Sequence, residues 1–269
     1  MNLFVVISDL HLWQSLTLLV VISACVVTAI STVRYFHMQS KYSIFSKYNN
    51  DFLVGSFAAI GALYGVFIAF TITEGIKFFI AAEDAVVDEF ESLEKIKEIS
   101  STIGVDYPTE VATFITVVED YVTSVVDEEW EYMSVYKKLR PETTLKSKAI
   151  LPAIEVLRKS TSGYENHIER LISYYERIVN DRTIRASYSS IDYSFDSNAL
   201  WTVVVIGAIC NMTLFYCFNV NNNIVISLVM FSFLVLVGIC MIVHVYTVTP
   251  LTGDYFRLKP MFFESLIGR

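Results

Sequence analysis

The chain has 269 residues, of which 54% are hydrophobic, and it carries a formal net charge of −8 with a mean hydropathy of +0.50. Soluble domains are usually about 45–50% apolar, so this composition predicts a protein embedded in a lipid bilayer. An acidic chain lacks the basic surface that phosphate backbones require, which excludes nucleic acid as an expected partner.

Charged side chains are concentrated in one internal block. Residues 83–197 contain 23 of the 28 acidic and 13 of the 20 basic residues, a net charge of −10, whereas the 57 positions 197–253 contain no Asp, Glu, Lys or Arg. We therefore expect three parts: an N-terminal transmembrane hairpin at 1–81, a helical domain at 82–197, and a C-terminal transmembrane hairpin with a short tail at 198–269.

Four stretches are long enough to cross a bilayer, which takes about 20 apolar residues. The predicted spans are 12–33, 52–73, 200–218 and 224–248, with a break at 219–223 between the last two. An uncleaved first span is preferred over a secretory signal, because the first eleven residues contain Asp9 and no Lys or Arg. All four cysteines lie inside predicted spans, so neither a disulfide nor a zinc site is expected, and no cofactor is predicted.

An even number of spans places both termini and the 82–197 domain on one side of the membrane and the 34–51 loop on the other. Three basic residues lie in the loop, and more lie near the membrane on the domain's side: Lys77, Arg182, Arg185, Arg257, Lys259 and Arg269. The positive-inside rule therefore predicts an integral membrane protein whose N- and C-termini and 82–197 domain are cytoplasmic.

The 82–197 domain is predicted to contain helices only, which makes the fold class all-α. The second span should continue into it, since apolar residues keep a helical spacing at Val86, Phe90, Leu93, Ile96 and Ile99. The next predicted helix has Asp106 as N-cap and buries Val111, Phe114, Ile115, Val118, Val122, Val125, Trp130 and Met133. Pro141 and Pro152 are expected near helix starts. The last helix should bury Tyr164, Ile168, Leu171, Tyr175, Ile178 and Val179.

The second span has two dissimilar faces. Small residues suited to close helix packing form one face: Gly55, Ala58, Ala62, Gly65 and Ala69. The opposite face is a candidate pore lining: Ile60, Tyr64, Phe67, Thr71 and Glu74. The alternative is that Glu74 extends to the headgroups beside Lys77 while the bulky residues face lipid.

Other polar residues have less specific interpretations. Asn211 is expected to form an interhelical hydrogen bond rather than bind a ligand, and His244 either marks the interface or belongs to a proton relay. The acidic runs at 83–91 and 127–131 lack the spacing of a calcium loop and are interpreted as solvated helix faces. No nucleophile or metalloprotease motif occurs, so an enzyme is not predicted.

Several segments in order resemble the bestrophin-like family of bacterial membrane proteins. They are YNNDFLVGSFAAIGALYGVFIAF, DEFESL, YVTSVVDEEW, two arginines ahead of ALW, and TPLTGDYFRLKP, spread from about Tyr48 to Phe262. The positions that match the family's recurrent residues are Asn49, Glu89, Tyr121, Glu129, Trp130, Arg182, Arg185, Trp201, Pro250 and Gly253. Leu251 replaces the family's usual Phe, and Glu74 stands where an aromatic residue is expected, so ion selectivity does not carry over.

True bestrophins are pentameric ion channels with four membrane helices and a pore lined by the second. The resemblance therefore implies a homo-oligomer of five subunits that conducts inorganic ions across the lipid bilayer through an axis lined by the second span. The acidic domain favours cations over chloride, because acidic walls raise the local cation concentration. The alternative function is a non-conducting membrane scaffold or regulatory protein whose cytoplasmic helices bind a protein partner.

Overall fold

The computed structural model describes residues 12–39, 50–189, 194–218, 222–248, Pro250 and 258–268, and all regular elements in these ranges are helices. The all-α class is thus confirmed. The chain divides into two compact units. Unit 1 comprises Met1–Lys77, Ser194–Val248 and Gly253–Tyr255, and unit 2 comprises Phe78–Tyr193, Thr249–Thr252 and Phe256–Arg269.

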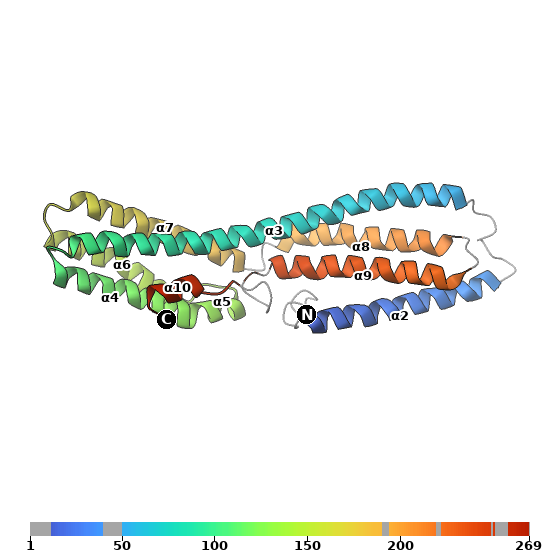
Figure 1. Cartoon of the computed structure of the whole chain (residues 1–269), viewed down its shortest axis with the longest axis horizontal. Coiled ribbons are helices and arrows are strands. Elements are labelled where there is room, and N and C mark those ends of the chain that lie inside the picture. Colours follow the sequence, from blue (N-terminus) through green and yellow to red (C-terminus); the bar gives the residue numbers. More distant parts are fainter. Residues whose placement is uncertain are drawn as a thin grey trace. The chain divides into compact units, whose positions relative to one another are not determined.

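Figure 1 labels the helices in chain order. They are α2 (Leu12–Gln39), α3 (Asn50–Ile103), α4 (Pro108–Ser124), the π-helix η2 (Val125–Glu129), α5 (Trp130–Tyr136), α6 (Pro141–Ser160), α7 (Glu165–Ser189), α8 (Ser194–Cys217), α9 (Asn223–Val248) and α10 (Met261–Leu266). Helix α3 is continuous over 54 residues and belongs in part to each unit, so the predicted extension of the second span as one helix is confirmed.

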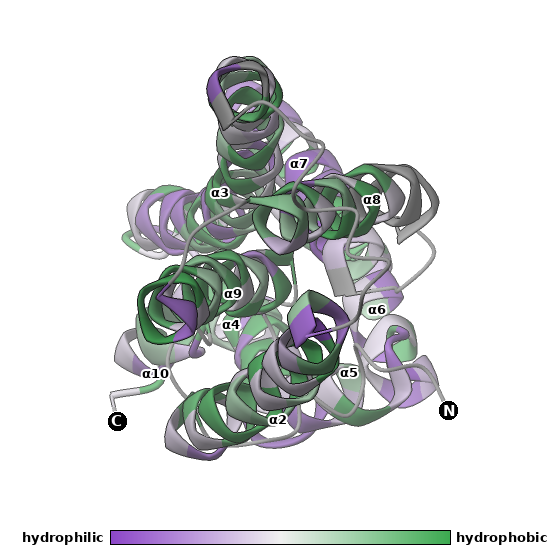
Figure 2. Cartoon of the chain, turned by 90° about the vertical axis from the view of Figure 1, so that its right-hand side faces the viewer, coloured by the Kyte–Doolittle hydropathy of each residue, from purple (hydrophilic) through white to green (hydrophobic). Residues whose placement is uncertain are grey.

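Unit 1 contains the apolar helices. Within the described residues, three helical stretches are long and apolar enough to cross a membrane: Leu12–Gln39, Leu53–Ile103 and Asn223–Val248. The apolar part of α8, Thr202–Cys217, is shorter, so the fourth span remains a prediction. Figure 2 shows mostly apolar ribbon in α2 and α9, as expected of helices surrounded by lipid.

Helix α2 packs along α9, and the two lie side by side in Figure 1. Val27 of α2 belongs to one buried cluster with Ile226 and Met230 of α9. The hydroxyls of Ser31 and Ser227 are 2.6 Å apart across this contact. The two-hairpin arrangement, which pairs the first span with the second, remains a prediction, because the described contact of α2 is with α9.

Glycines allow α3 to approach its neighbours closely in unit 1. A Cβ added at Gly207 of α8 would lie 2.6 Å from Cε2 of Tyr64 on α3, well inside van der Waals distance. A Cβ added at Gly75 of α3 would lie 2.7 Å from Nδ1 of His244 on α9 and closer still to the hydroxyl of Thr247. The absence of side chains at Gly75 and Gly207 therefore sets the spacing of α3 from α8 and α9.

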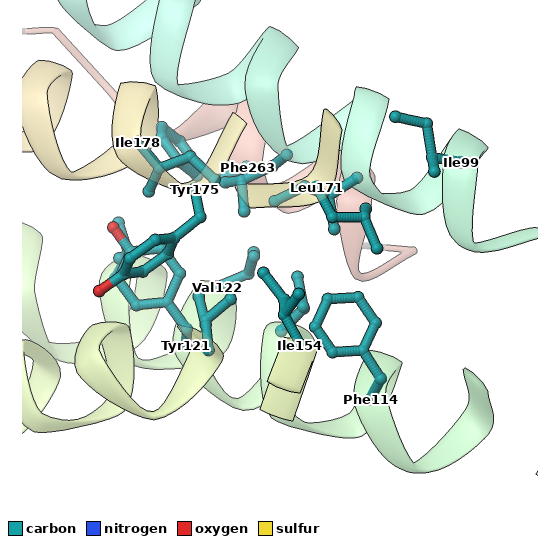
Figure 3. Close-up of a cluster of buried hydrophobic side chains, with 14 of the residues drawn as sticks. Ile99, Phe114, Tyr121, Val122, Ile154, Leu171, Tyr175, Ile178 and Phe263 are labelled. Atoms are coloured by element: carbon teal, nitrogen blue, oxygen red, sulfur yellow. The ribbon is translucent and has the colours of Figure 1, made fainter. Parts of the chain in front are cut away.

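Unit 2 is built around a single apolar core, to which the charged part of α3, α4, η2, α5, α6, α7 and α10 all contribute. Figure 3 shows side chains from several of these helices converging on this core. The predicted buried face of α3 is confirmed, with Val86, Leu93, Ile96 and Ile99 buried and Phe90 partly buried.

Three local predictions were wrong. The N-cap of α4 is Tyr107, and the Asp106 carboxylate instead accepts a hydrogen bond of 2.6 Å from the Tyr164 hydroxyl. Pro152 lies inside α6 rather than near its start, and its exposed ring removes only one backbone donor from a helix held by packing on α4 and α7. Val179 is 39% exposed, because the buried face of α7 passes through Ile178.

The C-terminal helix α10 completes the core of unit 2. Phe263 is fully buried, and its ring centroid lies 6.0 Å from that of Trp130. Lys97 of α3 donates a hydrogen bond of 2.5 Å to the Leu266 carbonyl. The role of this C-terminal segment in the core was not predicted from the sequence, because its apolar run is too short to show a periodicity.

A double-mutant cycle tests the close approach of α3 and α8. Gly207→Ala should destabilise unit 1 by about 1–3 kcal/mol, because the new methyl group overlaps the Tyr64 ring. The same substitution should cost much less in a Tyr64→Leu background, where the ring is gone. Thermal unfolding of the four proteins in detergent measures the difference. An equal loss in both backgrounds would contradict the contact.

Candidate functional site

Four charged side chains are buried together in unit 2. Glu89 comes from α3, Glu129 ends η2, and Arg182 and Arg185 lie one turn apart on α7. Both glutamates have no exposed surface, and both arginines are buried. Two positive and two negative charges balance, which is how charges are usually tolerated in a core. We call Glu89, Glu129, Arg182 and Arg185 the buried ionic network.

The guanidinium groups of the two arginines link the two carboxylates into one continuous series of ion pairs. Nε of Arg185 is 2.9 Å from Oε2 of Glu89, and its Nη2 is 3.0 Å from Oε1 of Glu129. Arg182 binds Glu129 through both Nε and Nη2, with 3.1 Å from Nε to Oε1. Arg185 thus bridges α3 to η2, a task that needs a planar guanidinium with several donors.

Neutral side chains complete the network's hydrogen bonds. The Tyr121 hydroxyl of α4 donates to Glu89 at 2.5 Å, and the Thr144 hydroxyl of α6 is 3.1 Å from Nη2 of Arg182. The Trp130 ring lies 5.0 Å from the guanidinium carbon of Arg185. Its indole N–H donates to the Leu258 carbonyl at 2.8 Å, which attaches the C-terminal segment to the network.

Burial and neighbouring charges together set the pKa values of these groups. It raises the pKa of Glu89, against the opposing charge of Arg185 and the hydrogen bond from Tyr121. Burial and the charge of Glu89 raise the pKa of Tyr121 well above its ordinary value, so the phenol keeps its proton and donates it. Burial alone would lower the pKa of Arg185, but the carboxylates of Glu89 and Glu129 outweigh it and raise that pKa.

A π-helical turn places Glu129 in the network. In η2 the N–H of Trp130 donates to the Val125 carbonyl, five residues back, so the turn contains one more residue than an α-helical turn. One extra residue rotates the following positions by about 100° relative to an uninterrupted α-helix. The single long helix predicted from Val111 to Met133 is therefore interrupted at the position that turns both Glu129 and Trp130 toward α7.

Six of the ten positions picked out by the resemblance gather at this one place: Glu89, Tyr121, Glu129, Trp130, Arg182 and Arg185. Pro250 is buried, and its carbonyl accepts a hydrogen bond of 2.8 Å from the Leu258 N–H. Asn49, Gly253 and the Trp201 side chain lie outside the part of the chain that the structure describes.

Part of the network could have been recognised from spacing. Glu89 falls three residues after Val86 and four before Leu93, on the apolar face of α3. Arg182 and Arg185 continue the 4- and 3-residue steps of the buried face of α7. A charge at a position where the periodicity requires an apolar residue signals a buried ion pair. Thr144, which the sequence analysis did not single out, carries no such signal.

In unit 1 the chain's own helices cover one part of α3 and leave the rest exposed. The small residues predicted for packing are all exposed in the single chain: Gly55, Ala58, Ala62, Gly65 and Ala69. Of the predicted lining, Ile60, Phe67 and Glu74 are exposed, whereas Tyr64 and Thr71 are buried. Tyr64 packs with Val204 of α8 and Val237 of α9, so the chain's own helices cover part of the predicted lining face.

Glu74 forms an ion pair with Lys77 one turn later, with 2.8 Å between Oε1 and Nζ. Both side chains are more than half exposed, at 54% and 66%. Such an exposed pair contributes little to stability, but it places a positive charge directly beside the Glu74 carboxylate.

The other polar residues of unit 1 make local contacts. The Asn211 amide donates to the Gly207 carbonyl of its own helix at 2.8 Å, instead of the interhelical bond that was predicted. Gly61 of α3 lies near this amide, and a Cβ added there would be 3.8 Å from Oδ1 of Asn211. His244 is buried against Gly75 and the Thr71 backbone. Among the described residues, no group of His, Cys, Asp and Glu could hold a metal ion.

Removing one cation from the network should destabilise unit 2 in a pH-dependent way. Arg185→Met leaves Glu89 without its cation, which we expect to cost about 3–5 kcal/mol at neutral pH. The pKa of Glu89, already raised by burial, should rise further without Arg185. The folded state then binds a proton that the unfolded chain does not, so stability should recover as the pH falls through the raised pKa.

Thermal unfolding of the full chain between pH 8 and pH 5 measures this effect. Arg170→Met, at an exposed position of α7, serves as the control and should change stability by no more than about 0.5 kcal/mol. A deficit in Arg185→Met that stays constant over the whole pH range would contradict the assignment of Glu89 as the carboxyl left unpaired.

Comparison with known proteins agrees with this geometry. The family model described as Bestrophin-like domain matches residues 21–256, which cover both apolar ends and the whole buried ionic network. No curated protein and no solved structure matches the chain significantly. The match extends over most of the chain and includes its apolar helices. The chain is therefore a helical membrane protein that belongs to the bestrophin-like family.

Proposed function

We propose that the protein is a homo-oligomeric ion channel, of five subunits by family resemblance, in which α3 of each subunit lines a shared axis. Channels rather than enzymes characterise the family to which the chain belongs. In this proposal the path runs between copies, along the axis that they share.

The exposed small-residue face of α3 is the observation that carries the proposal. Neither Gly55 nor Gly65 has any atom within 4 Å of the position where a Cβ would lie. A membrane helix with such a face is suited to close contact with another helix, since small residues let two backbones approach. No helix of unit 1 covers this face in the described residues, and a neighbouring copy would supply the cover.

Ile60, Phe67 and Glu74 are the lining residues that this proposal retains, because they are exposed on the face opposite the small residues. Tyr64 and Thr71 would line the axis only if α3 turned away from α8 and α9. Two apolar residues followed by a carboxylate would form a narrow apolar constriction with a charged ring at one end.

We propose a preference for cations. Residues 83–197 carry a net charge of −10, and many of their carboxylates are exposed on α3 beyond Glu74. A path that opens beside such a surface would concentrate cations and repel anions. In the orientation proposed from the basic residues, this acidic domain and both termini lie in the cytoplasm.

The second candidate function is a non-conducting membrane scaffold or regulator that binds a protein partner through unit 2. The ion pair of Glu74 with Lys77 favours it, because the pair neutralises the one carboxylate among the proposed lining residues. A channel carries ionic current across a bilayer and a scaffold does not, so electrical recording separates the two functions.

Thiol labelling tests the proposed orientation. Ser43→Cys lies in the 34–51 loop and Ser187→Cys near the end of α7, each in a background whose four natural cysteines are replaced. In intact cells an impermeant thiol reagent should label position 43 and leave position 187 unlabelled until the membrane is permeabilised. Labelling at 187 alone would show that the orientation is inverted.

Paired substitutions of Glu74 and Lys77 test the path. If both line it, Glu74→Gln should lower the ratio of cation to anion permeability and Lys77→Gln should raise it, because each removes one ring of charge. Reversal potentials in a salt gradient across a planar bilayer measure the ratio. Two unchanged reversal potentials would remove both residues from the path, and a wild type without current under all conditions would favour the scaffold.

A further inference from the structure

The outer face of α6 carries an apolar row that no described part of the chain covers. The inward face of α6 is buried against α4 and α7 through residues that include Ile150, Ile154 and Leu157. On the opposite face lie Leu145, Ala149, Pro152 and Val156, all exposed. Leu145 and Val156 are 69% and 63% exposed. We call these four residues the α6 outer stripe.

The spacing of the α6 outer stripe is informative. Successive members are separated by four, three and four residues, so they align along one side of the helix over three turns. This alternation is the one that places apolar residues in the seam between two packed helices. Single exposed apolar residues are normal on a protein surface, but an aligned row is typical of a surface that another protein segment covers.

Charge distinguishes α6 from the rest of unit 2. The helix contains four basic and two acidic residues, a net charge of +2, whereas residues 83–197 together carry −10. Lys146 pairs with Asp120, and Arg158 pairs with Glu155 and Glu169. Lys148 and Lys159 flank the stripe, and neither forms an ion pair within the described ranges of the chain. The stripe therefore has an unpaired positive edge.

A complementary partner must offer an acidic surface, and this chain itself has one. Glu83, Asp84, Asp88 and Glu91 are exposed on α3, and none of them forms an ion pair with another described residue. An anionic lipid surface would also attract the lysines, but it would repel a domain that carries −10. A second copy satisfies both the lysines of α6 and the carboxylates of α3.

We propose that the α6 outer stripe is the surface through which unit 2 of one copy docks on unit 2 of the next. A basic, apolar face on one copy that meets an acidic face on the other joins two different surfaces. Such heterologous contacts form a ring when the rotation from one copy to the next closes on itself. The inference rests on the homo-oligomer proposed above and adds the surface that holds its water-exposed domains together.

Labelling of single cysteines tests whether the stripe is covered. Leu145→Cys is introduced in the background without natural cysteines, and its reaction rate with a water-soluble maleimide is compared between the intact oligomer in mild detergent and dissociated subunits. We expect at least about tenfold slower labelling in the oligomer. Val105→Cys is the matched control, because Val105 is an exposed valine of unit 2 that is not part of the α6 outer stripe, at 79% exposure. Its rate should be the same in both states.

Leu145→Glu and Val156→Glu provide a second measurement, by light scattering of the full chain. Each should raise the concentration at which half of the protein is assembled by about tenfold or more, because a charge replaces an apolar side chain in the contact. Val105→Glu should leave assembly unchanged. Since both stripe positions are exposed in the single chain, the substitutions should not impair folding.

The outcomes separate this inference from the proposed channel. A wild-type oligomer in which position 145 labels as fast as in dissociated subunits would overturn the docking surface and leave the homo-oligomer intact. Protection at position 145 that requires anionic lipid vesicles and not assembly would overturn it in favour of a lipid surface. A wild type that is monomeric in mild detergent and in lipid nanodiscs would overturn both the docking surface and the channel.

Discussion

The guanidinium group of Arg185, shared between two carboxylates that have no exposed surface, is the constraint on which unit 2 depends. A lone guanidinium or carboxylate at that depth would cost several kcal/mol, so each charge is tolerable only while the others stay in place. Glu89 and Arg185 are 96 positions apart in sequence, and Arg182 and Glu129 are 53 apart. The network therefore selects one mutual arrangement of α3, η2 and α7 among the many that apolar packing alone would allow.

The π-helical turn and Trp130 both help to hold this arrangement in place. The π-helical turn interrupts what would be one helix and points Glu129 and Trp130 inward, at the cost of a less favourable backbone geometry. Trp130 then covers the Arg185 guanidinium and binds the C-terminal segment through its indole N–H. Six of the positions picked out by the resemblance therefore contact one another here and join helices that are distant in sequence.

Apolar periodicity predicted the class, the continuity of α3 and most of the buried positions, because those depend only on local spacing. It could not assign partners. The small-residue face of α3 was predicted to pack, and the structure leaves it exposed in one chain, where the close approaches of α3 use Gly207 of α8 against Tyr64 and Gly75 against α9. Periodicity identifies which residues share a face but not whether the same chain or another copy covers that face. The ion pairs were not predicted, for the same reason. The spacing along α3 shows that Glu89 points inward, but it does not show that an arginine of α7 lies opposite it.

The position of Phe263 has a consequence for how the protein is made. The core of unit 2 is assembled from residues 78–193, yet it is completed by Phe263 of α10, and α8 and α9 lie between them in the sequence. A ribosome must therefore synthesise two apolar helices after the body of unit 2 and before its last core residue. During that interval the Trp130 indole lacks the Leu258 carbonyl and the core lacks the Phe263 ring. The core of unit 2 can therefore be completed only after α8 and α9 have been synthesised, although most of its residues leave the ribosome before them.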